Sequence, residues 1–132
     1  MASDTLHEDS TRLGPAVIDQ HRAIVSLMEE LEAVDWYNQR AKATGNSDLR
    51  AILEHNRDEE KEHAAMVLEW LRRGDPKLSQ HLKTFLFSEG PITEIEAEME
   101  QGGAAGESGD GMSSDGSLGI GSLRLAKEKV SK

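Results

Sequence analysis

Two long stretches without an internal glycine or proline dominate this sequence. The first covers residues 15–43, the second covers 48–73, and the segment TGNSD lies between them. Both consist mainly of good helix formers, and apolar side chains recur at helical spacing. In the first stretch the recurring apolar residues are Val17, Ile24, Met28 and Leu31. This pattern predicts two long helices that a short turn joins into an antiparallel hairpin.

The boundaries of these stretches carry typical helix start and stop signals. Pro15 suits the first turn of a helix, and either Asn46 or Ser47 can cap the start of the second one. The tripeptide Gly-Asp-Pro at 74–76 then ends the second stretch. Together these signals define the length of both helices.

Two shorter helical segments follow the hairpin. An amphipathic segment occupies 77–87, and Pro91 opens an acidic helix that reaches about Glu100. A chain of 132 residues is long enough for one domain but not for two. We therefore expect an all-α fold with a single helical domain over residues 15–100.

The segments outside this domain are polar or rich in glycine. Residues 1–14 are predicted to be a flexible N-terminus. Residues 101–117 contain six glycines and almost no apolar side chains, which predicts a flexible linker. The aliphatic segment LGIGSLR at 118–124 follows, and a basic tail occupies 125–132. A short apolar segment behind a linker is typical of a docking motif, although a frayed tail with chance aliphatics gives the same pattern.

Charge and cysteine content exclude several functions. The formal net charge is -10 and the pI is about 4.9, so we expect no nucleic-acid partner and a surface that attracts cations. The chain has no cysteine, which excludes disulfides, zinc fingers and thiol chemistry. Any metal site must therefore use histidine and carboxylate ligands.

The apolar content is low for a chain that folds alone. Hydrophobic residues make up 36% and aromatic residues 4% of the sequence, so we expect a homo-oligomer. No apolar run approaches the roughly 20 residues that span a bilayer, and the N-terminus lacks the features of a secretion signal. These observations predict a soluble, cytoplasmic protein without a membrane partner.

The second long stretch places two polar side chains on its apolar stripe. Arranged as heptads, the stripe consists of Leu49, Leu53, Asn56, Glu60, His63, Val67 and Trp70. Glu60 and His63 lie in the middle of it, whereas Asp58 and Lys61 point elsewhere. On its own, a Glu-x-x-His pair is weak evidence, because it arises by chance in glutamate-rich helices.

The first long stretch has a matching feature at Glu30. Its neighbours on the same helix face are Ala23, Leu27, Val34 and Tyr37. A carboxylate in such surroundings requires a partner, because burying an unpaired charge costs several kcal/mol. If the chain reverses near residue 45, antiparallel helices bring residue 30 level with residue 61. We therefore expect Glu30 to meet Glu60 and His63.

One hairpin cannot cover both sides of this stripe. Two hairpins related by a twofold axis form a four-helix bundle with one shared core. The bundle then holds two copies of Glu30 and two Glu60-x-x-His63 pairs. This is the ligand set of carboxylate-bridged di-iron proteins, which predicts a di-iron centre between two subunits.

Several segments resemble the encapsulated ferritin family. They are HRAIVSLMEELEAVDWYNQR, HNRDEEKEHAAMVLEWLRR and LFSEGPIT, and the segment LGIGSLR resembles the peptide that targets cargo to encapsulin nanocompartments. The resemblance implies a ferroxidase whose di-iron centre forms at a dimer interface, with Glu60 bridging the metals. It also implies an annular decamer of five dimers that lies inside an encapsulin shell, which it binds through Leu118 to Arg124 and which stores the iron.

The resemblance assigns roles to further residues. Tyr37 matches a tyrosine near the family's di-iron centre, although a plain core or interface aromatic fits equally well. Glu29 and Glu32 lie on another face, near Trp36, and match residues that attract iron. A further metal site of the family matches the stripe of His55, Glu59 and Glu62. These secondary sites could hold calcium or other divalent ions, whereas spacing alone indicates ordinary surface charge.

Three other interpretations remain open from the sequence. The first is a non-catalytic helical cargo module that binds metal without turnover. The second is hemerythrin-like oxygen binding, which needs more histidines than the helical part supplies at suitable levels: His21, His55, His63 and His81. The third is a purely structural stripe in which Glu60 and His63 set the helix register and bind no metal.

Overall fold

The computed structural model describes residues 5–105, and all secondary structure in this range is helical. The elements are α1 (Ser10–Ala43), α2 (Ser47–Arg73), α3 (Pro76–Phe85) and α4 (Ile92–Ala105). The chain divides into two compact units between Ser88 and Glu89, so α1 to α3 belong to the first unit and α4 to the second. The predicted all-α fold is therefore confirmed for the described residues.

Helix α1 begins earlier than the predicted start at Pro15. The Asp9 carboxylate caps it by accepting hydrogen bonds from the Thr11 amide at 2.9 Å and the Thr11 hydroxyl at 2.8 Å. Gly14 then leaves helical geometry, with φ 80° and ψ 162°. Positive φ values of this size suit glycine, which has no Cβ. Pro15 thus follows a kink inside α1, and the segment Ser10–Leu13 forms a separate first turn.

The reversal between α1 and α2 lies where the sequence predicts it. Helix α1 ends at Ala43, and the side-chain oxygen of Asn46 caps α2 by accepting from the Leu49 amide at 2.9 Å. Across the turn, Arg50 donates from Nε to the Ala41 carbonyl at 3.2 Å and from a terminal nitrogen to the Thr44 carbonyl at 2.7 Å. These bonds satisfy carbonyls at the C-terminal end of α1 and fix the hairpin at its closed end.

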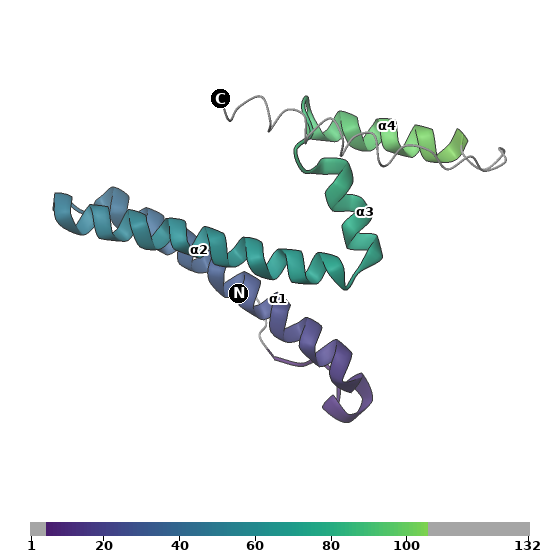
Figure 1. Cartoon of the computed structure of the whole chain (residues 1–132), viewed down its shortest axis with the longest axis horizontal. Helices are drawn as coiled ribbons and strands as arrows, with labels where there is room; N and C mark the ends of the chain where they lie inside the picture. Colours follow the sequence, from purple (N-terminus) through teal and green to yellow (C-terminus); the bar gives the residue numbers. More distant parts are fainter. Residues whose placement is uncertain (1–4, 106–132) are drawn as a thin grey trace, which may run out of the picture. The chain divides into compact units, whose positions relative to one another are not determined.

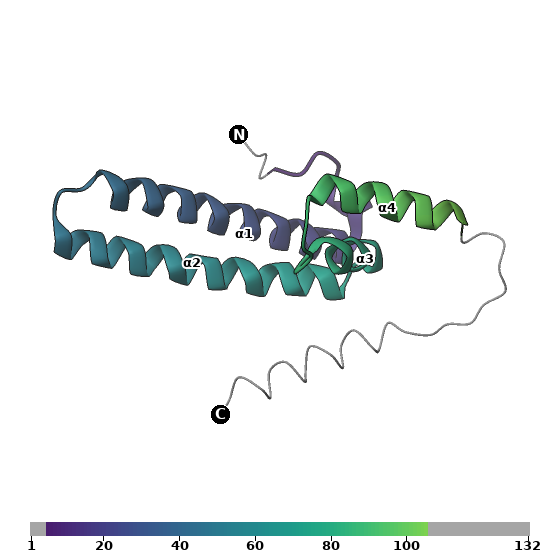
Figure 2. The ribbon, with the colours of Figure 1, turned by 90° about the horizontal axis from the view of Figure 1, so that it is seen from above.

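Helices α1 and α2 run antiparallel and side by side along most of α2 (Figures 1 and 2). Among the described residues, only Ala41 and Ala64 are buried apolar side chains, with 3% and 7% of their surface exposed. Small residues at these positions let the two helix backbones approach closely. The hairpin therefore has a narrow contact seam instead of a core.

Large apolar side chains remain exposed on both helices. On α1 they recur every seven residues at Val17, Ile24 and Leu31. On α2 they occupy Leu49 and Ile52 near its start and Met66 and Trp70 near its end, and His63 lies on the same face one turn before Met66. We call the five α2 residues Leu49, Ile52, His63, Met66 and Trp70 the open stripe. An apolar surface of this length is typical of a protein–protein contact.

The predicted buried stripe of α2 is only partly correct for the single chain. Leu53, Asn56, Glu60 and Val67 are half-buried against α1, as expected. Leu49, His63 and Trp70 are exposed instead. The reason is geometric, since one neighbouring helix covers only one side of an apolar stripe that is wide enough for two.

Helix α3 is held to the end of α2 by a polar network. The Asp75 carboxylate caps α3 by accepting from the amides of Lys77 and Leu78. Glu69 accepts hydrogen bonds from Arg72 and Arg73, which lower its pKa to about 2. Arg72 also donates to the Ser79 hydroxyl at 2.9 Å. The start of α3 is thus fixed by side chains rather than by apolar packing.

Helix α4 is longer than the sequence pattern indicates. It follows Pro91, as expected, but continues beyond Glu100 to Ala105, so the first residues of the predicted linker over 101–117 are helical. Residues 106–117 and the predicted docking motif at 118–124 lie outside the described range. None of the described helices combines the length and apolarity needed to cross a bilayer.

Candidate metal centre

The structure brings Glu30, Glu60 and His63 together near the middle of the hairpin. One ligand atom from each of these residues lies within 4.8 Å of the others. His63 Nδ1 is 3.2 Å from a Glu60 carboxylate oxygen and 3.7 Å from a Glu30 carboxylate oxygen. Among the residues that the structure describes, this is the only group of three or more potential metal ligands.

The hairpin register produces this cluster. The turn between Ala43 and Ser47 places the middle of α1 opposite the middle of α2, so Glu30 faces the turn of α2 that carries Glu60. His63 lies one helical turn after Glu60, on a neighbouring part of the same face. An i, i+3 spacing therefore presents an oxygen and a nitrogen ligand toward one point.

The three side chains differ in exposure. The Glu30 and Glu60 side chains are 27% and 23% exposed, because they lie between the helices, whereas the His63 side chain is 48% exposed. His63 belongs to the open stripe, so the cluster is sheltered by the hairpin on one side and accessible on the other. A metal ion or a further ligand can reach it from the open side.

Mutual contacts shift the pKa values of all three groups. A hydrogen bond with Glu60 is the main cause that raises the pKa of Glu30, and burial and repulsion from Glu60 add to it. The same hydrogen bond lowers the pKa of Glu60. Of the two carboxyl groups, Glu30 is therefore the weaker acid. The hydrogen bond to Glu60 also raises the pKa of His63.

This donor set fits a divalent iron or similar ion. Two carboxylates and one imidazole combine hard oxygen ligands with the nitrogen ligand that iron also accepts. Binding requires Glu30 to be deprotonated and His63 to be neutral, since only deprotonated groups ligate metals. Because contacts within the cluster raise the pKa values of Glu30 and His63, metal binding competes with protons at both groups.

Tyr37 lies two turns from Glu30 on α1 and is half-buried. The Arg40 guanidinium lies 5.7 Å from its ring centroid and 5.9 Å from that of Trp36, which gives two cation–π contacts. The assignment of Tyr37 near a metal centre stays a prediction.

The secondary sites are not assembled in the single chain. Glu29 and Glu32 are exposed on α1, and the charge of Glu29 contributes to the raised pKa of Glu30. His55 Nε2 lies 3.6 Å from a Glu59 oxygen, while Glu62 is exposed and does not complete a three-residue group with them. Both sites remain predictions.

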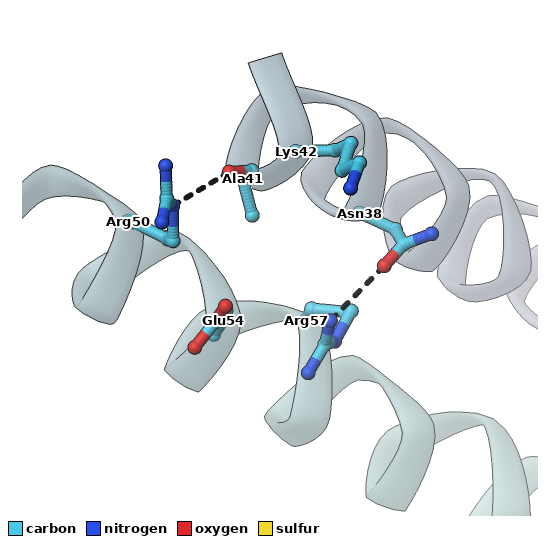
Figure 3. Close-up of a pocket in the computed structure, with 6 residues that line it drawn as sticks. All are labelled: Asn38, Ala41, Lys42, Arg50, Glu54 and Arg57. Carbon is cyan, nitrogen blue, oxygen red and sulfur yellow. Dashed lines mark hydrogen bonds between the residues drawn. The ribbon is translucent and has the colours of Figure 1, made fainter. Parts of the chain in front are cut away.

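Sequence reasoning missed one polar cluster, which surrounds a cavity near the closed end of the hairpin (Figure 3). It contains the side chains of Lys42, Arg50 and Arg57. Arg50 and Arg57 are seven residues apart and therefore lie on one face of α2, a sequence signal that could have indicated the cluster. The position of Lys42 on the facing helix depends on the hairpin register.

Comparison with known proteins identifies the family. Residues 5–89, well over half of the chain, match the EncFtn-like family. The chain belongs to this family. The resemblance to encapsulated ferritins that the sequence analysis found is therefore confirmed.

Relatives of this EncFtn-like chain share most of its length. An encapsulated ferritin-like protein from Rhodospirillum rubrum is 58% identical over 126 residues, which are 93% of this chain and 90% of the relative. A ferritin-like protein from Thermotoga maritima is 52% identical over 108 residues, covering 82% of this chain and 94% of the relative. The encapsulin nanocompartment cargo protein EncC from Myxococcus xanthus is 35% identical over 105 residues, covering 76% of this chain and 80% of the relative.

A solved structure also matches this EncFtn-like fold. The crystal structure of protein ne0167 from Nitrosomonas europaea superposes with a TM-score of 0.64 at 57% sequence identity. The match covers 66% of this chain and 96% of the other. The helical arrangement described above is therefore shared with a relative of high sequence similarity.

The geometry of the cluster in this EncFtn-like protein predicts how the pKa of His63 responds to substitution, and this can be tested without metal. A hydrogen bond to the Glu60 carboxylate is the main cause of the raised His63 pKa, and the charge of Glu60 adds to it, so Glu60→Gln should lower the pKa of His63. Asp58→Asn changes a carboxylate two residues before Glu60 that faces Arg57 and Lys61 instead, and should leave the pKa of His63 unchanged. NMR titration of the histidine ring signals measures both, and an unchanged His63 pKa in Glu60→Gln would contradict the geometry.

Proposed function

We propose that this protein is a ferroxidase, which oxidises ferrous iron with dioxygen at a di-iron site shared by two copies of the chain. The observation that supports this most strongly is the convergence of Glu30, Glu60 and His63 within 4.8 Å on a half-open face of the hairpin. Family membership supports the ferritin-like assignment independently. Iron is the substrate of this reaction.

A second copy of the chain is needed because one chain supplies too few ligands. Three donors leave much of the coordination sphere of even a single iron ion open. His63 lies on the open stripe between Ile52 and Met66, which are 57% and 65% exposed. A twofold-related hairpin that covers this stripe buries it and adds a second set of the same ligands. Dimerisation thus completes the fold and the site together.

Each residue has a distinct role in the proposed site. As the resemblance to encapsulated ferritins implies, Glu60 bridges two ions in this proposal, whereas Glu30 and His63 each bind one. Two ions held about 3.5 to 4 Å apart can each give one electron to dioxygen, which accepts the pair. Carboxylate ligands suit both oxidation states, because ferrous and ferric ions are hard enough to favour oxygen donors. Tyr37 is proposed to lie beside this site in the dimer.

Replacement of the ligands tests the reaction. Glu60→Ala and His63→Ala should each reduce rapid ferrous oxidation at least about tenfold, since losing even an outer-shell partner of a metal ligand typically lowers metal affinity or activity by about 10- to 100-fold. Absorbance of ferric product and oxygen consumption measure the rate. Asp58→Asn is the matched control on α2 and should retain the wild-type rate. Full activity in either ligand variant would refute the site, and metal binding without oxygen consumption by the wild type would favour the non-catalytic module.

The open stripe gives a prediction about assembly. Met66→Glu places a charge on the stripe one turn from His63, and should prevent dimerisation and iron oxidation without unfolding the hairpin. Ala65→Glu introduces the same charge at an exposed neighbouring position off the stripe, and should retain both. Native mass spectrometry measures the oligomer, for which the wild type is expected to be a decamer of five dimers. A dimer that persists in Met66→Glu with full activity would place the interface elsewhere.

We also propose that the protein is cargo of an encapsulin nanocompartment in the cytoplasm, where the shell stores the ferric product. The names of two relatives, from Rhodospirillum rubrum and Myxococcus xanthus, describe encapsulated or cargo proteins. The segment LGIGSLR at 118–124 would bind the shell. Deletion of residues 118–132 should abolish co-purification with a co-expressed shell and leave iron oxidation unchanged. Continued co-purification would show that another part of the chain binds the shell.

A further inference from the structure

A cavity of about 280 Å³ lies between α1 and α2 near the closed end of the hairpin (Figure 3). Its lining residues are Asn38, Ala41, Lys42, Arg50, Glu54 and Arg57. The cavity is distinct from the Glu30–Glu60–His63 cluster, with which it shares no lining residue. None of its lining side chains is aromatic, so it lacks the stacking surface of a nucleotide site.

The charge of this lining is opposite to that of the whole protein. Three cations face one carboxylate, which gives a formal charge of +2 in a chain whose net charge is -10. Like charges that converge on one cavity repel each other unless an anion lies between them. The lining therefore needs an anionic partner more than the rest of the surface does.

Arg50 is held in place by neutral partners. Its Nε donates to the Ala41 carbonyl at 3.2 Å, and one terminal nitrogen donates to the Thr44 carbonyl at 2.7 Å. Among the described residues it forms no salt bridge. These two bonds fix the guanidinium while leaving its charge uncompensated and its second terminal nitrogen free to donate.

Arg57 is similarly oriented and only partly compensated. Its side chain is 23% exposed, and one terminal nitrogen donates to the Asn38 side-chain oxygen at 3.0 Å. Its Nε donates to Asp58 at 3.0 Å, but the same Asp58 oxygen also accepts from Lys61 at 3.0 Å. One carboxylate thus serves two cations. The remaining terminal nitrogen of Arg57 and the Asn38 amide group are available to a ligand.

Lys42 and Glu54 complete the lining with opposite charges. Lys42 is exposed at the last turn of α1 and forms no salt bridge within the described part of the chain. Glu54 lies on α2 between the two arginines, as Figure 3 shows, but none of its oxygens forms an ion pair with either of them within 4.0 Å. Glu54 therefore weakens the positive potential of the cavity without neutralising it.

We propose that this cavity binds a small tetrahedral oxyanion, of which inorganic phosphate is the probe of choice. Two pre-oriented guanidinium groups and one ammonium group supply several charge-assisted donors, and arginine matches phosphate geometry well. The lining is too polar for an organic anion with an apolar body. A cation is excluded by the charge of the lining.

This inference does not depend on the proposed ferroxidase activity, because the oxyanion contacts none of the proposed iron ligands. Arg57 and Glu60 are nonetheless only one helical turn apart on α2. A bound oxyanion would therefore lie beside the cluster without belonging to it. Binding can be measured on the iron-free protein, so failure of one proposal leaves the other intact.

The test is a phosphate titration of the full-length, iron-free protein at pH 8 and constant ionic strength. Arginine ¹H–¹⁵Nε NMR signals of Arg50 and Arg57, assigned with the Arg50→Lys and Arg57→Lys variants, report on the cavity directly. Phosphate should shift both signals in a saturable manner. Sodium chloride at the same ionic strength should not, and sulfate should behave like phosphate if shape and charge decide binding.

Two variants with opposite expected effects on phosphate affinity make the test specific. Lys42→Ala removes one positive charge and should weaken phosphate binding about threefold, within the range of partly exposed charge pairs. Glu54→Gln removes the repelling carboxylate and should strengthen binding by a similar factor. Neither substitution removes a hydrogen bond that holds the hairpin, and circular dichroism checks that both variants are folded.

Three outcomes would overturn the proposal. The first is the absence of a saturable shift with phosphate. The second is an equal response to chloride at matched ionic strength, which would show general screening. The third is equal phosphate affinity in the wild type, Lys42→Ala and Glu54→Gln, which would place the bound anion outside this cavity.

Discussion

A hairpin of two helices has only one contact seam, and the other features of this protein follow from that constraint. Among the described residues the seam buries just Ala41 and Ala64. An apolar stripe on a long helix is wider than a single neighbour can cover, so Met66 and Trp70 remain exposed. Such a chain gains little free energy from burial alone. Its capping contacts, its polar clusters and its proposed dimerisation all compensate for this narrow seam.

The same constraint explains how two carboxylates can occupy the middle of the hairpin. In a closed core, Glu30 and Glu60 would carry a large desolvation penalty. Here about a quarter of each side chain is exposed, and a hydrogen bond between the two raises the pKa of Glu30 and lowers that of Glu60 next to His63. Partial exposure therefore makes the cluster stable without metal and also leaves it open to an incoming ion. A second chain that covers the open stripe would exclude solvent from the cluster and strengthen the interactions within the site.

The success of the sequence analysis differed between elements for identifiable reasons. The turn near Asn46 was predicted correctly, and with it the level at which Glu30 meets α2, because both depend only on local breakers and on a constant helix rise. The start of α1 was missed, because Asp9 caps a short turn before the Gly14 kink. The burial of Leu49 and Trp70 was wrong for the single chain, since periodicity shows that a face is apolar but not what covers it.

The sequence alone determined the two long helices, their turn and the register that brings Glu30, Glu60 and His63 to one level. These follow from helical period and from glycine, proline and capping residues, which act within a few positions along the chain. Only the tertiary structure decided how the side chains pair across the hairpin. The bonds from Arg50 to the end of α1, the contact of Arg57 with Asn38 and the hydrogen bond between Glu30 and Glu60 depend on interatomic distances between separate helices. Such distances arise from packing, which no local sequence pattern encodes.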